Sequence, residues 1–81
     1  MTKAPLVASD IGKESAADVF PARLKAMRNK QQIDQRTLAE LCGLSKDMIG
    51  QYERGEKMPS LKTAITMADY FDVSLDYLLG R

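Results

Sequence analysis

The stretch Gln35–Arg54 reads QRTLAELCGLSKDMIGQYER and contains two short helical patterns on either side of Gly43. Apolar residues recur in both halves at about the 3.6-residue spacing of an α-helix, which predicts two helices that each bury one face. The residues that can share one small core are Leu38, Ala39, Cys42, Leu44, Ile49 and Tyr52. Gly43 stands where the first helix must end and the backbone must turn, in a conformation that costs glycine least.

Two further residues fit a steep crossing of these helices. Ser45 follows the turn and is a suitable N-cap for the second helix. Ala39 is small, as two helices that approach closely after a turn of three or four residues require. The stretch is therefore predicted to form a helix-turn-helix.

The same region carries a longer series of residues at fixed spacings. The series is Gln35, Leu38, Ala39, Gly43, Ser45, Ile49, Tyr52, Glu53 and Gly55, followed by Met58-Pro59-Ser60 and by VSLDYLL over 73–79. In this order it resembles the phage-repressor helix-turn-helix family (Cro/repressor or XRE type), roughly from Phe20 to the C-terminus. The resemblance implies a lambda-repressor-like fold and a sequence-specific DNA-binding transcriptional regulator, and it favours a repressor.

The rest of the chain adds three helices. Asp18 is placed as the N-cap of a helix over 19–31 in which Phe20, Leu24 and Met27 form an apolar stripe, and residues 1–17 are predicted to be a flexible tail. Asp34 caps the helix over 35–42, and the helix over 46–54 ends before Gly55. Ser60 and Ser74 cap the last two helices, and the apolar stripe expected in the core is Leu61, Ala64, Ile65, Ala68 and Phe71. The fold class is therefore all-α, with one five-helix domain over 18–81.

Composition narrows the class of protein. The 81 residues suit one small domain, and no run of about eighteen apolar residues is present, so we expect a cytoplasmic protein without a membrane partner. Cys42 is the only cysteine and there is no histidine, so the sequence offers too few ligands for zinc, and Cys42 is expected to be buried. We expect no metal and no cofactor.

The net charge of +1 is too small to indicate nucleic-acid binding by itself, but its distribution is uneven. Between Val19 and Lys57 there are eight basic residues against five acidic ones, whereas both ends of the chain are mildly acidic. This pattern is a weak form of the basic face expected of a DNA-binding domain, and an ordinary solvated surface would also produce it.

The outer face of the helix over 46–54 is the best candidate surface. An α-helix fits the major groove of DNA, where Gln51 can pair with adenine, Lys46 can donate to guanine and Asp47 can accept from cytosine. Each of these could equally be a solvated polar residue. Gly50 is also expected on this face, where it could allow close approach of DNA. The candidate phosphate contacts are Gln35, Arg36, Ser45, Arg54 and Lys57.

Two further expectations concern structure and assembly. The resemblance implies that Arg28 and Glu53 form a partly buried ion pair between the first and third helices. Tyr77 and Leu79 point away from the side of their short helix that covers the core, and they would be left in water. They are therefore predicted to form the interface of a homodimer that binds a palindromic site on double-stranded DNA.

No constellation of catalytic residues is present, because the chain has no histidine, no phosphate-binding glycine loop and no nucleophile beside a base. An enzyme is therefore not expected. The alternative to a DNA-binding regulator is a helical module, antitoxin-like or regulatory, that binds other proteins and has no DNA specificity of its own. The weak net charge favours that alternative.

Overall fold

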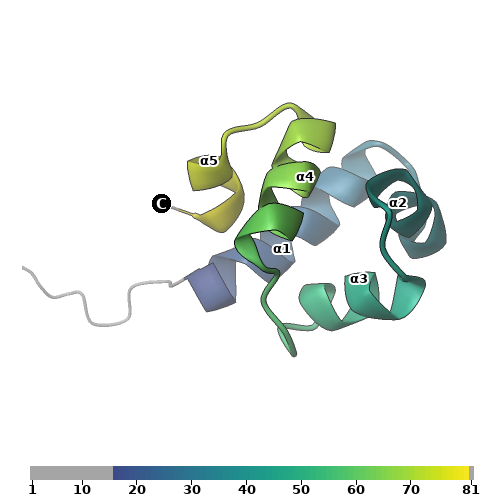
Figure 1. The fold of residues 1–81 in the computed structure, drawn as a ribbon, viewed down its shortest axis with the longest axis horizontal. Coiled ribbons are helices and arrows are strands. Elements are labelled where there is room, and N and C mark those ends of the chain that lie inside the picture. The colour runs from purple at the N-terminus through teal and green to yellow at the C-terminus, as the bar shows by residue number, and fades with distance from the viewer. Residues whose placement is uncertain (1–15, 81) are drawn as a thin grey trace, which may run out of the picture.

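Five helices follow one another along residues 16–80, the part of the chain that the computed structural model describes. They are α1 (Ala16–Lys30), α2 (Gln35–Cys42), α3 (Lys46–Glu53), α4 (Leu61–Phe71) and α5 (Leu75–Leu79), as Figure 1 shows. These residues contain no strand, so the predicted all-α class is confirmed. None of the helices among them is long and apolar enough to cross a membrane.

Four helices begin at a predicted capping residue. In each case the side-chain oxygen of the cap accepts a hydrogen bond from the amide three residues later, which satisfies one of the free N–H groups of the first turn. The caps are Asp34, Ser45, Ser60 and Ser74. Gly43 follows α2 in the left-handed conformation (φ 71°), as its place in the turn predicted.

The start of α1 differs from the prediction. The helix begins at Ala16, so Asp18 lies in its first turn and is not its N-cap. Two alanines, which have the highest helix propensity, extend the helix toward the N-terminus, and Pro21 is accommodated inside it. The tail predicted for 1–17 lies outside the described residues except for these last two. At the other end of the motif, Arg54 is the C-cap of α3 and not part of the helix.

The core gathers one face of every helix. Its fully buried large side chains are Phe20, Leu24, Leu38, Ile49, Met67 and Leu78. The ring of Phe20 meets that of Tyr52 edge to face with centroids 5.9 Å apart, which joins α1 to α3. In Figure 1, α1 runs behind α4, with α2 and α3 on one side and α5 on the other. The helix-turn-helix of α2 and α3 thus lies at one end of the domain, and α5 lies at the other.

The apolar stripe predicted for α4 is only partly correct. Ala64, Ala68 and Phe71 are buried, but Leu61 is 66% exposed and Ile65 is 43% exposed, while Met67 is fully buried. The buried set follows an i, i+3, i+4, i+7 pattern from position 64, which turns Leu61 and Ile65 outward. Since α4 packs between α2 and α5, it is the position of those neighbours that decides which apolar residues face inward.

The short helix α5 contacts α1 at its middle residue and at its C-cap. Arg23 donates to the backbone carbonyl of Tyr77, and its guanidinium carbon lies 4.2 Å from the centre of the Tyr77 ring. At the C-cap of α5, a Cβ on Gly80 would collide with the side chain of Val19. This close contact of backbone and side chain requires glycine at position 80.

We expect Ala39→Leu to lower the free energy of unfolding by ~1–3 kcal/mol, because Ala39 is 2% exposed where α2 crosses α3 and a larger side chain would overpack the crossing. Thermal and urea denaturation followed by circular dichroism would measure it. Leu41→Ala is the matched control on the same helix, since Leu41 is 54% exposed and its loss should change the melting temperature little. Equal melting of Ala39→Leu and the parent protein would contradict this account of the crossing.

Candidate nucleic-acid interface

The outer face of α3 presents the three residues predicted to read bases. Lys46 and Asp47 are exposed in the first turn of the helix, and Gln51 is half-buried one turn further on. Asp47 and Gln51 are four residues apart and therefore neighbours on one face. The structure thus brings the predicted base-reading residues together on a single helix that lies along one side of the molecule.

The start of α2 and the start of α3 contribute the predicted phosphate contacts. Gln35 and Arg36 are the first two residues of α2, and Ser45 is the N-cap of α3. The Ser45 hydroxyl oxygen accepts from the Met48 amide at 3.1 Å, so its own proton is free to donate. Helix N-termini with free amides attract anions. The Asp34 carboxylate shows this effect at α2, where the hydrogen bond from the Thr37 amide lowers its pKa below the usual value.

The ion pair expected from the family resemblance is present. The guanidinium of Arg28 donates to both oxygens of Glu53, from Nε at 2.6 Å and from Nη2 at 3.0 Å, and its Nη1 donates to the Ile33 carbonyl at 2.9 Å. The side chains are only 12% and 3% exposed, respectively. The Gln35 amide also donates to Glu53, at 3.1 Å. One carboxylate therefore joins α1, the start of α2 and the end of α3.

The sequence predicts Gly50 on the open outer face of α3, and this prediction is wrong. Gly50 is buried, because the Arg54 guanidinium and the Gln35 amide cover it. A Cβ at this position would come within 2.9 Å of Arg54 Nη1 and 3.7 Å of Gln35 Oε1. The absent side chain therefore makes room for the Arg54 guanidinium, whereas Gln35 would only touch a Cβ.

The structure adds one charged residue that sequence reasoning missed. Glu56 accepts from Arg54 Nε at 2.8 Å and from Nη2 at 3.1 Å, and both side chains are more than half exposed. The hydrogen bonds and charge of Arg54 lower the pKa of Glu56. Gly55, with φ 75°, turns the chain between them, and this tight turn is the signal that could have indicated the pair. Lys57 is exposed in the same loop.

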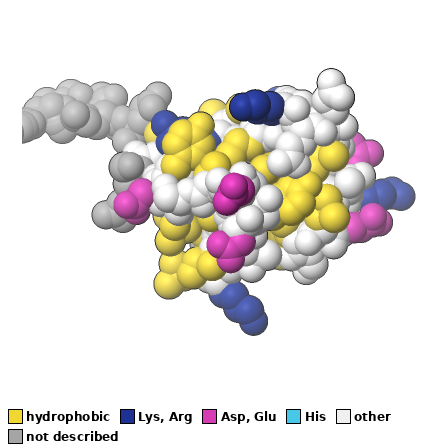
Figure 2. Space-filling view, turned by 90° about the horizontal axis from the view of Figure 1, so that it is seen from above, with side chains coloured by type: hydrophobic (Ala, Val, Ile, Leu, Met, Phe, Trp, Pro, Cys, Tyr) yellow, Lys and Arg dark blue, Asp and Glu magenta, His cyan; other side chains and the backbone are white. Residues whose placement is uncertain are grey.

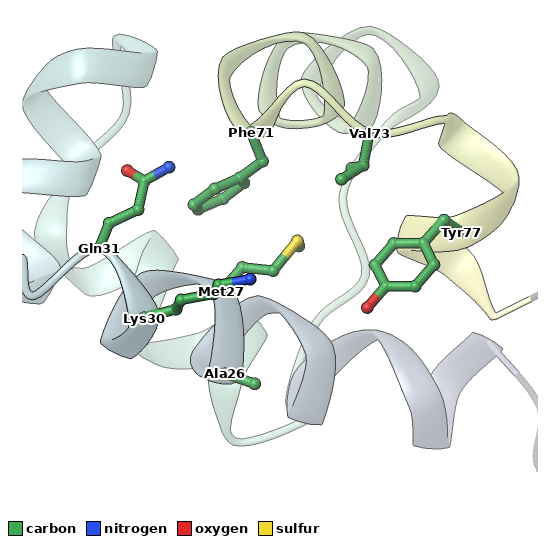
Figure 3. A pocket seen from close by; sticks show the side chains of 7 residues that line it. All are labelled: Ala26, Met27, Lys30, Gln31, Phe71, Val73 and Tyr77. Atoms are coloured by element: carbon green, nitrogen blue, oxygen red, sulfur yellow. The ribbon is translucent and has the colours of Figure 1, made fainter.

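A surface pocket of about 460 Å³ lies elsewhere on the molecule, and Figure 3 shows the side chains around it. No residue of α2 or α3 contributes to it. Its lining residues are Ala26, Met27, Lys30, Gln31, Phe71, Val73 and Tyr77. The Tyr77 ring forms one wall, between α1 and the chain that joins α4 to α5. This hollow therefore belongs to the region that also carries the predicted dimer contact.

The two predicted dimer residues differ in exposure. Tyr77 is 47% exposed, as expected, but Leu79 is half-buried and packs against the core cluster. The expectation that Leu79 would be left in water is therefore wrong, because the close approach of α5 to α1 carries it inward. Figure 2 shows apolar side chains spread over the face that α4 and α5 cover, with acidic ones among them.

Cys42 is buried as predicted, and its burial raises the pKa of the thiol. A protonated buried thiol is a poor nucleophile and a poor metal ligand. Over residues 16–80, the acidic and cysteine side chains form no group of three that could hold a metal ion. Cys42 is thus a core residue.

Comparison with known proteins gives consistent findings. A helix-turn-helix family profile matches residues 24–78. The uncharacterized HTH-type transcriptional regulator YqaE of Bacillus subtilis is 36% identical over 61 residues, which are 75% of this chain and 53% of YqaE. The control protein C.SmaI of Serratia marcescens is 32% identical over 73 residues, which are 90% of this chain and 87% of C.SmaI.

Among solved structures, the P22 c2 repressor in complex with a synthetic operator superimposes with a TM-score of 0.71. It is 32% identical, and the alignment covers 74% of this chain and 91% of that one. This chain spans about half the length of the first curated relatives that it matches.

We expect Arg28→Met to reduce the free energy of unfolding by about 3 kcal/mol, because it leaves the Glu53 carboxylate buried without its cation. Urea denaturation would measure the loss. The double variant Arg28→Met, Glu53→Met should recover much of it, since neither charge then remains. Arg54→Met removes a cation from the exposed pair and serves as the control, with a midpoint close to that of the parent protein. Equal effects of the two single variants would show that burial does not distinguish these pairs.

Proposed function

Because the chain belongs to the phage-repressor type of the helix-turn-helix family of transcriptional regulators, we propose that it binds operator DNA and reads the major groove with α3. The observation that carries this proposal is the outer face of α3, where Lys46, Asp47 and Gln51 stand together beside the N-terminus of α2. Their donors and acceptors match those of base edges in the major groove. A repressor is the favoured type of regulator.

The phosphate contacts of the proposed complex come from both sides of α3. Gln35 and Arg36 lie at the start of α2, Ser45 caps α3, and Arg54 and Lys57 follow it. Contacts of this kind position a protein on the duplex but carry no sequence information. The buried Arg28–Glu53 pair fixes the end of α3 relative to the start of α2, so base and phosphate contacts would keep one geometry. The proposal needs no catalytic residue or cofactor, and it places the protein in the cytoplasm.

Selection of binding sites from random duplexes tests this function. The expected result is enrichment of one short palindromic sequence that the protein binds well below the concentration needed for unrelated DNA. If no sequence is enriched and no duplex is bound at low salt, the chain is instead a helical module that binds other proteins. The small net charge of +1 favours that second outcome.

We also propose that the chain binds DNA as a homodimer through the surface around Tyr77. This ring is large, 47% exposed and next to the surface pocket of α1, α4 and α5, and the half-buried Leu79 lies on the same short helix. A two-fold axis there would place two α3 helices about one DNA turn apart, ~34 Å, on a palindromic operator. Each half-site would then be bound by identical contacts.

We expect Gln51→Ala to relax the preference at one operator position by ~1–3 kcal/mol, because the bidentate amide contact to a base is lost. Parallel titrations of the selected duplex and single-mismatch duplexes would measure this change. Asn29→Ala removes an exposed amide from α1 and is the control, with an unchanged preference. A Gln51 variant with the parent protein's full preference profile would rule out base reading by this residue.

We expect Tyr77→Lys to make the protein sediment as a monomer while α1 to α4 stay helical, because a charge would be placed in an apolar interface. Sedimentation equilibrium and circular dichroism would measure the two properties. Ile65→Lys is the matched control, since Ile65 on α4 is exposed to a similar degree, at 43%. A Tyr77→Lys protein that still dimerises would place the interface elsewhere.

A further inference from the structure

The charges along α3 and the turn that follows it cancel. Lys46, Arg54 and Lys57 are balanced by Asp47, Glu53 and Glu56. Arg28 from α1 neutralises Glu53 in the buried pair, so that carboxylate does not act on the outer surface. The acidic groups that remain near Arg54 are Asp47 on α3 and Glu56 beyond Gly55.

Glu56 holds Arg54 in a specific way. Its two oxygens take the Nε and Nη2 hydrogens of the guanidinium, at 2.8 and 3.1 Å. This is the paired-donor geometry by which arginine binds a phosphate group. The remaining nitrogen, Nη1, lies over Gly50. The carboxylate therefore occupies the edge of Arg54 on which two oxygens of a phosphate would fit.

Gly50 contributes to this arrangement. A Cβ here would come within 2.9 Å of Arg54 Nη1, so glycine lets the guanidinium rest against α3 near Gln35 without shifting. Arg54 thus sits among residues that the proposed function assigns to DNA, and its two principal hydrogen bonds go to Glu56.

We infer that Glu56 is an internal competitor of DNA, a carboxylate that must release Arg54 before Arg54 can bind a backbone phosphate. This inference rests on the proposed function and adds a regulatory residue to the same surface. Exposed ion pairs of this kind are weak, because water and salt screen both charges, so a phosphate can displace the carboxylate.

The competition has a measurable signature in salt dependence. Each cation that neutralises a phosphate releases counterions and steepens the dependence of log affinity on log salt by ~0.9 for duplex DNA. An arginine already neutralised by Glu56 contributes less than that. The parent protein should therefore show a shallower slope than a protein whose Arg54 has no internal partner.

The test measures the affinity of the full chain for the selected duplex between about 50 and 200 mM salt, a range over which phosphate contacts change affinity strongly. Glu56→Gln keeps the size of the side chain and removes its charge. It should bind roughly 2- to 5-fold more tightly per protomer at the lowest salt, because an exposed arginine–carboxylate pair no longer has to be broken before Arg54 meets the phosphate. Its slope should be steeper by up to about 0.9 per protomer, the full contribution of one freed cation.

Two controls separate competition for Arg54 from a general change of charge. Glu40→Gln removes the same charge from the exposed side of α2 and should leave both affinity and slope nearly unchanged. In an Arg54→Gln background, Glu56→Gln should gain much less than it gains in the parent protein, because there is no guanidinium left to release.

Each outcome decides the inference. A tighter and more salt-dependent Glu56→Gln protein, with the gain lost in the Arg54→Gln background, supports it. Unchanged binding, or weaker binding because Glu56 orients Arg54 for DNA, would overturn the inference and leave the proposed function standing. Equal gains with and without Arg54 would also overturn it, since the effect would then be charge alone. If neither the parent protein nor Glu56→Gln binds any duplex at low salt, the proposed function fails, and this inference fails with it.

Discussion

The buried ion pair of Arg28 and Glu53 is the interaction on which the arrangement of the helix-turn-helix depends. Burying a charge is costly unless the charge is paired and its remaining hydrogen-bonding capacity is used. Here Arg28 donates hydrogen bonds to both carboxylate oxygens of Glu53 and to the Ile33 carbonyl, and Glu53 also accepts one from Gln35. The pair thus fixes the angle of α3 against α1 and, through Gln35, holds the first residue of α2 beside it.

Much of this architecture could be predicted from local chemistry. An N-cap acts through a local hydrogen bond, in which its side-chain oxygen accepts from the backbone amide three residues later. The N-caps Asp34, Ser45, Ser60 and Ser74 could therefore be assigned without knowledge of the fold. The turn at Gly43 was predictable for the same reason, since its conformation is set by its own backbone. The ion pair was expected only from the resemblance, because residues 25 positions apart give no local sign of contact.

The features that the sequence did not predict are set by contacts between residues that are distant in sequence or that a turn brings together. Leu61 and Ile65 have the spacing of core residues, but the packing of α2 and α5 against α4 exposes them and buries Met67. The spacing of α3 puts Gly50 on the outer face of the helix, but the side chains of Arg54 and Gln35 cover it.

The attachment of α5 to α1 has a consequence for the order in which the domain opens. A helix of five residues is too short to be stable alone, so α5 exists as a helix only while Arg23, Val19 and the core hold it in place. The Arg23–Tyr77 contact joins residues 54 positions apart, so forming it requires closure of a long stretch of chain. We expect the amides of this segment to exchange faster than those of the longer helices. If subunits join there, association and the ordering of α5 are one equilibrium, and the concentration of the protein would set how much of this helix is formed.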